Sequence, residues 1–165
     1  MIQSVKPAPT DETDGLPMPK RIWAVISVGF ALCMSVLDVN IINIVLPTLS
    51  HDFGTSPAVT TWIINGYQLA IVVSLLSFSA LGEIIGYRKV YLSGIGLFCI
   101  TSLICALSDS FWTLTIARIF QGFSASAITS VNTAQLRYIY PKSQLGRGMG
   151  INAMVVAISA AAGPS

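Results

Sequence analysis

Two ionisable residues, Asp38 and Arg118, stand inside long apolar stretches of this sequence. A charged side chain within a membrane costs about 2.5 to 3.5 kcal/mol on insertion scales, so each is a functional candidate. Asp38 lies eight residues before Leu46, and Arg118 lies seven residues after Phe111. At about 1.5 Å per helical residue, these positions have similar depths, and we expect the two charges to face one another across a helix pair.

A carboxyl group beside a guanidinium group suits the loading and unloading of protons. Burial disfavours the ionised carboxyl group, whereas a neighbouring cation favours it, so a change in hydration could move its proton affinity. Asp38 and Arg118 are therefore a candidate functional pair. The alternative is a structural ion pair that only orients two helices.

Other polar side chains lie in the same apolar stretches. We expect five of them to line a substrate cavity, namely Asn40, Asn43, Asn65, Gln68 and Gln121. Ordinary hydrogen bonding between helices is the alternative for each. Arg118, Gln121, Gly122 and Ala125 share one helical face, and the small pair Gly122 and Ser126 predicts a close approach of a neighbouring helix.

The elements that must position these residues are membrane-spanning helices. Of the 165 residues, 53% are hydrophobic and only 10% are charged, with a mean hydropathy of +0.73. A soluble domain has about 25% charged residues, so this is a membrane chain. A span needs about 20 apolar residues. The apolar stretches predict spans over residues 22–46, 59–81, 90–107, 111–136 and 149–165, the last incomplete.

Four polar segments flank or separate the predicted spans. Residues 1–20 contain four prolines and an acidic cluster, which predicts a disordered tail. Residues 47–58 are expected to form a loop, residues 82–90 a polar hinge, and residues 137–147 a basic loop. Since lysine and arginine collect in alternate connections, we expect the N-terminus to be cytoplasmic. Because a fifth span of 17 residues is too short to cross, we expect the chain to be the front part of a longer protein.

Several functional classes have no support in the sequence. The net charge of +2 is too small to suggest nucleic-acid binding. Cys33, Cys99 and Cys105 lie in apolar runs without the spacing of metal ligands, so we expect them to pack as small hydrophobic residues and expect no metal site. No motif for nucleophilic, metal-dependent or phosphate chemistry occurs, and we expect neither an enzyme nor a cofactor.

Two stretches resemble motifs of the major facilitator superfamily, and more narrowly of its drug:proton antiporters of the fourteen-span (EmrB/QacA) type. LDVNIINIVLP resembles the first-span signature, with Asp38, Asn43, Leu46 and Pro47 at characteristic positions. Asn40 stands where threonine is commoner. LTIARIFQGFSASA resembles the fourth-span motif, with Leu114, Arg118, Gln121 and Gly122 in register.

Two further stretches extend the resemblance over most of residues 21–165. SALGEIIGYRKVYL resembles the motif between spans two and three, whose matching positions are Glu83, Gly86, Arg88 and Lys89. Ser79, Ile84 and Tyr87 depart from that motif. AGPS resembles the opening of the fifth-span antiporter motif through Gly163 and Pro164.

The resemblance implies an all-α membrane protein, of which this chain forms the N-terminal part of a helical bundle. It implies export of lipophilic or cationic drugs in exchange for protons, the coupling ion, across the bacterial inner membrane. It also implies that Asp38 and Arg118 take part in proton coupling. Its partners would be the lipid bilayer, a small-molecule substrate, the C-terminal half of the same protein and, in some systems, a periplasmic adaptor and an outer-membrane channel.

Two alternatives remain open at this point. One is a transporter of the same superfamily that imports or exports another small molecule, such as a metabolite. The other is a membrane fragment that does not transport.

Overall fold

The computed structural model describes residues 15–162, and these residues form helices joined by short connections, with no strand among them. In chain order the helices are α1 (Met18–Asp52), α2 (Pro57–Thr60), α3 (Trp62–Ile85), α4 (Tyr87–Ala106), α5 (Phe111–Ile139), the 3-10 helix η1 (Lys142–Gln144) and α6 (Leu145–Ala162). The expected all-α class is confirmed. By length and composition, α1, the α2–α3 stretch Pro57–Ile85, and α4 could each cross a membrane.

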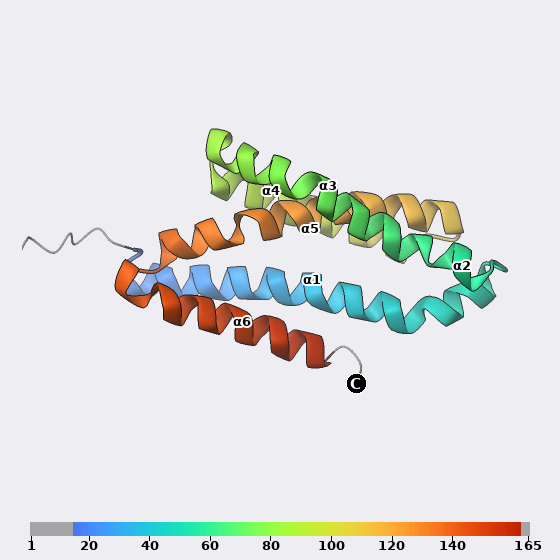
Figure 1. Cartoon of the computed structure of the whole chain (residues 1–165), viewed down its shortest axis with the longest axis horizontal. Coiled ribbons are helices and arrows are strands. Elements are labelled where there is room, and N and C mark those ends of the chain that lie inside the picture. The colour runs from blue at the N-terminus through green and yellow to red at the C-terminus, as the bar shows by residue number, and fades with distance from the viewer. Residues whose placement is uncertain (1–14, 163–165) are drawn as a thin grey trace, which may run out of the picture.

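The helices form two layers that meet along α5 (Figure 1). In one layer α3 and α4 pack against α5 along most of its length. In the other, α6 runs beside the first half of α1. The contact of α1 with α5 joins the two layers.

Small residues allow α5 to approach both of its layer neighbours closely. A Cβ atom at Gly122 would collide with the carbonyl oxygen of Tyr67 and lie 2.9 Å from the Cβ atom of Ala70. The hydroxyl group of Ser126 donates a hydrogen bond to the carbonyl oxygen of Ile71 at 3.3 Å. The close approach predicted from Gly122 and Ser126 is therefore present, between α5 and α3.

The first helix is longer than the predicted span at both ends. It begins at Met18, inside the expected tail of residues 1–20, and continues through Pro47 to Asp52, where a loop over residues 47–58 was expected. That loop prediction was wrong for residues 47–52, since Pro47 lies inside α1. A proline within a helix removes one backbone N–H donor and crowds the carbonyl group four residues earlier, a cost of about 3 kcal/mol that membrane helices tolerate. The chain turns at Phe53–Ser56 instead, and the Ser56 hydroxyl group caps α2 by accepting from the Val59 N–H at 3.4 Å.

The other connections are also shorter than expected. The hinge predicted over residues 82–90 shrinks to Gly86, which separates α3 from α4 and has a φ of +99°. Space around Gly86 is open, so its left-handed backbone is what requires glycine. The loop predicted over residues 137–147 is mostly helical, since α5 runs to Ile139 and η1 leads into α6.

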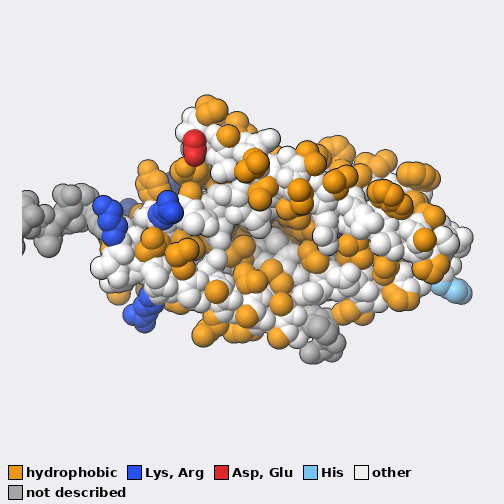
Figure 2. Space-filling model, viewed as in Figure 1, with side chains coloured by type: hydrophobic (Ala, Val, Ile, Leu, Met, Phe, Trp, Pro, Cys, Tyr) orange, Lys and Arg blue, Asp and Glu red, His pale blue; other side chains and the backbone are white. Residues whose placement is uncertain are grey.

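Residues before α1 are tied to the connection between α5 and α6. The Leu16 N–H donates to the carbonyl oxygen of Ile139 at 3.2 Å. Arg21 donates from Nε to the carbonyl oxygen of Leu16 and from Nη1 to Oε1 of Gln144, each at 3.1 Å. Basic side chains gather at this end of the molecule, and His51 marks the opposite end (Figure 2).

Gly122 provides a test of the α3–α5 packing. Gly122→Ala should lower the free energy of unfolding by about 1–3 kcal/mol, because its new methyl group has no room against the backbone of Tyr67. Thermal unfolding of the purified protein in detergent measures the change. Gly96→Ala is the matched control, since its methyl group enters open space within α4 and improves helix propensity. Equal melting temperatures for the two variants would contradict this packing.

Candidate functional site

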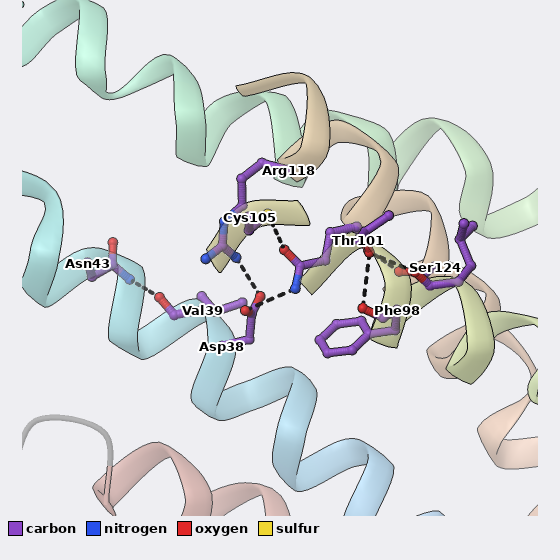
Figure 3. Close-up of polar contacts among 10 residues, drawn as sticks. Asp38, Val39, Asn43, Phe98, Thr101, Cys105, Arg118 and Ser124 are labelled. Atoms are coloured by element: carbon purple, nitrogen blue, oxygen red, sulfur yellow. Dashed lines mark hydrogen bonds and ion pairs between the residues drawn. The ribbon is translucent and has the colours of Figure 1, made fainter. Parts of the chain in front are cut away.

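The two ionisable residues of the apolar stretches meet where α1 contacts α5. Nη1 of Arg118 donates to Oδ2 of Asp38 at 2.6 Å, a short, charge-assisted hydrogen bond within an ion pair. Figure 3 shows the two side chains pointing toward one another from their helices. The expectation that Asp38 faces Arg118 is confirmed by this contact.

The packing around the pair explains why the two residues meet. One turn further along α1 lies Ile42, and one turn earlier along α5 lies Leu114, and both belong to one buried apolar cluster. The two helices thus run antiparallel in a register that places residue 38 opposite residue 118. Asp38 and Arg118 each lie four residues from a member of this apolar cluster, Ile42 and Leu114. The two charges therefore lie at the same depth, as the comparison of their positions in the sequence predicts.

Asp38 has a second partner on α5. Nε2 of Gln121 donates to Oδ1 of Asp38 at 3.1 Å, so each oxygen of the carboxyl group accepts a hydrogen bond from α5. Gln121 is fully buried, and its Oε1 accepts in turn from the Cys105 thiol group of α4 at 3.4 Å. Four side chains from three helices therefore form one polar cluster, which we name the Asp38 cluster: Asp38, Arg118, Gln121 and Cys105.

The ion pair lies in a largely dry setting. The side chains of Arg118 and Asp38 are only 9% and 15% exposed. Nε of Arg118 is buried and has no partner among the described residues, so the guanidinium group uses Nη1 alone for this contact. Separating the pair here would leave two poorly compensated charges, which is strongly unfavourable.

Sequence reasoning missed two residues near the pair. Cys105 packs against the apolar cluster of Ile42 and Leu114, as expected, but its thiol group also donates to Gln121, which the sequence did not indicate. Tyr67 of α3 is 4% exposed and interacts electrostatically with Asp38 and Arg118. The close contact of Gly122 with the Tyr67 backbone, one turn from Arg118, holds this tyrosine beside the cluster. The signal that could have indicated Tyr67 is its helical spacing from the apolar residues Ile63 and Ala70, four residues before it and three after it on the buried face of α3.

The remaining polar residues predicted for a substrate cavity do not join the Asp38 cluster. Nδ2 of Asn40 is buried and has no hydrogen-bond partner within residues 15–162, and Nδ2 of Asn43 donates to the carbonyl oxygen of Val39 in its own helix at 3.0 Å. Asn65 and Gln68 are exposed. A small cavity lies elsewhere, between α1, α5 and α6, and apolar residues such as Val28 line most of it. Lining of a substrate cavity by these side chains stays a prediction.

The motif residues between α3 and α4 lie at the basic end of the molecule. Glu83 ends α3, Gly86 forms the break, and Arg88 and Lys89 open α4. All four are exposed, and the three charged ones form no ion pair with the described residues. Gly163 and Pro164 lie outside the described residues.

Comparison with known proteins gives a family match over most of the chain. Residues 28–165 match the family model described as Major Facilitator Superfamily. The chain is 52% identical over 157 residues to the uncharacterized transporter YebQ of Escherichia coli strain K12. That alignment covers 95% of this chain and 34% of the relative.

Two further relatives have names that state a cargo. The riboflavin transporter RibZ of Clostridioides difficile is 32% identical, over 88% of this chain and 32% of its own length. The tetracenomycin C resistance and export protein of Streptomyces glaucescens is 33% identical, over 96% of this chain and 30% of its own length. The chain thus spans about a third of the length of these relatives.

A double-mutant cycle tests the Asp38–Arg118 contact. Asp38→Asn and Arg118→Gln should each lower the free energy of unfolding, and the double variant should lose less than the sum by about 0.5–3 kcal/mol, because each single variant leaves one buried charge unpaired. Thermal unfolding in detergent supplies the values. Asn43→Ala combined with Arg118→Gln is the matched control, since Asn43 bonds only its own helix and should show additive losses. Additive losses for the Asp38 cycle would refute the contact.

Proposed function

The chain belongs to the major facilitator superfamily, and from this premise we propose that the whole protein exports lipophilic or cationic drugs in exchange for protons. Asp38 is the residue at which proton and substrate exchange. The observation that carries the proposal is the buried hydrogen-bonded pair of Asp38, near the middle of α1, and Arg118, two turns into α5. Relatives whose names include drug efflux, resistance or export support it.

Protonation of Asp38 changes what joins α1 to α5. The ionised carboxylate accepts hydrogen bonds from Arg118 and Gln121, and its charge balances the guanidinium group. A proton on Asp38 removes that balance, so the attraction between the two helices falls. A site that opens to water on alternate sides of the membrane then takes up the proton on one side and releases it on the other.

A cationic or polar drug competes with the proton for the same carboxylate. Nε of Arg118 is buried and has no partner in the part of the chain that the structure describes, so the guanidinium group has a further donor for a polar substrate. Gln121 and the half-buried Asn40 supply further polar groups near this level of the helices. Asn43, Asn65 and Gln68 face a substrate cavity that the rest of the protein completes.

We assign the whole protein to the fourteen-span (EmrB/QacA) branch, in the bacterial inner membrane with a cytoplasmic N-terminus. The gathering of basic side chains at one end supports this orientation, since cytoplasmic loops collect lysine and arginine. Glu83, Arg88 and Lys89, which form no ion pair with the described residues, latch the C-terminal half on that side. Gly163 and Pro164 give the fifth span a close-packing, bendable segment. A periplasmic adaptor and an outer-membrane channel are proposed as partners of the whole protein.

A second candidate is a transporter of a metabolite. The relative named as a riboflavin transporter favours it. The two candidates share the fold and the Asp38 cluster and differ in cargo. Separate assays of riboflavin and ethidium transport by the whole protein in vesicles distinguish them, because a metabolite transporter would carry riboflavin and not the cationic dye.

Asp38→Asn tests the coupling role. In inverted membrane vesicles that hold the whole protein, a pH gradient should drive transport of ethidium, a lipophilic cation. The variant should reduce this transport to the level of vesicles without the protein, because an amide cannot exchange a proton. The volume of the side chain is kept, so the variant should still fold and insert.

Asp109→Asn is the matched control, since Asp109 is an exposed residue in the connection between α4 and α5. It should leave ethidium transport unchanged. Full pH-driven transport by Asp38→Asn, at equal protein level, would show that the coupling role is misassigned.

A further inference from the structure

The amide group of Gln121 contacts a hydrogen-bond acceptor on one side and a hydrogen-bond donor on the other. Its Nε2 faces Asp38 of α1 at 3.1 Å, and its Oε1 faces the thiol group of Cys105 of α4 at 3.4 Å (Figure 3). Gln121 is fully buried, so water cannot replace either partner. The orientation of its amide group therefore depends on these two contacts.

The thiol group decides between the two orientations of the amide. A neutral thiol donates through S–H, so it prefers the amide oxygen to the amide nitrogen. The amide nitrogen is then directed at Asp38, where it suits an ionised carboxylate, which only accepts hydrogen bonds. A protonated carboxyl group would instead donate its O–H to the amide oxygen, but that oxygen already accepts a hydrogen bond from the thiol group.

We propose that Cys105 is a positioning residue that holds the amide group of Gln121 in the orientation suited to ionised Asp38 and so sets the pH range over which Asp38 loads its proton. This inference rests on the proposed role of Asp38. It assigns to α4 a direct influence on a site formed by α1 and α5. No covalent chemistry of the thiol group is involved.

The other ionisable groups around Asp38 are few. Arg118 of α5 contacts it directly, Tyr67 of α3 lies near it, and Cys105 of α4 acts through Gln121. Arg118 and Tyr67 are kept in the variants below, so a change in pH dependence reports on the Cys105–Gln121 contact.

The test compares pH profiles of ethidium transport in inverted vesicles. Cys105→Ala removes the donor and frees the amide group to turn its oxygen to a protonated Asp38, so the midpoint of the profile should rise by about half a pH unit. Cys105→Ser restores a donor and should return the midpoint to that of the wild type. Cys99→Ala is the matched control, since Cys99 is an exposed thiol on the same helix.

Three results would overturn the inference. One is an unchanged midpoint in Cys105→Ala while Asp38→Asn abolishes coupling. Another is an equal displacement in Cys105→Ala and Cys105→Ser. A third is an infrared S–H stretching band of Cys105 that stays at the same frequency when Gln121 is replaced by Leu. The band is isolated by subtracting the spectrum of Cys105→Ser.

The infrared measurement also separates this inference from the proposed function. The band should lie at the frequency of a hydrogen-bonded thiol in the wild type and move to that of a free thiol in a Gln121→Leu background. A band that does not move refutes the contact, whether or not Asp38 couples protons. If the band moves and Asp38→Asn transports normally, the proposed function fails and with it the pH-setting role of Cys105, while the contact stands.

Discussion

The ion pair between Asp38 and Arg118 is a buried charged contact between α1 and α5, the helices at which the two layers meet. Both side chains are largely withdrawn from solvent, and each compensates a charge that would otherwise be costly to bury. Any movement that separates α1 from α5 must therefore hydrate these charges or remove one of them. In the proposed function, proton binding to Asp38 does the latter, so that a chemical event on one carboxyl group would act on the position of a helix.

The contacts on either side of α5 differ in kind. Toward α3, Gly122 presses on the backbone of Tyr67 and Ser126 donates to the carbonyl oxygen of Ile71, so this contact is close and fixed by shape. Toward α1, the first half of α5 makes a contact through charged and amide groups, and the strength of that contact depends on the protonation of Asp38. A rigid contact beside a titratable one is the arrangement expected where one layer moves against the other.

Much of the fold and part of the site could be predicted from the sequence. Apolar stretches of membrane length indicate the helices, and counting from their ends correctly pairs Asp38 with Arg118, since both helices keep the same rise per residue. The ends of the helices were harder to predict. Pro47 suggested the end of the first helix, yet α1 continues through it to Asp52. The contact of Cys105 with Gln121 could not be predicted, because α4 is apolar on all sides and its pattern does not indicate which face meets α5.

The most direct test of the account is the dipolar coupling between the carboxyl carbon of Asp38 and the guanidinium nitrogens of Arg118. Solid-state NMR of the isotope-labelled whole protein in lipid bilayers measures it, with Arg118→Gln identifying the signal. We predict strong coupling at high pH and weaker coupling at low pH, where the carboxyl shift becomes that of a neutral acid. Absence of coupling at every pH, or a coupling that stays constant across the range in which transport titrates, would contradict the account.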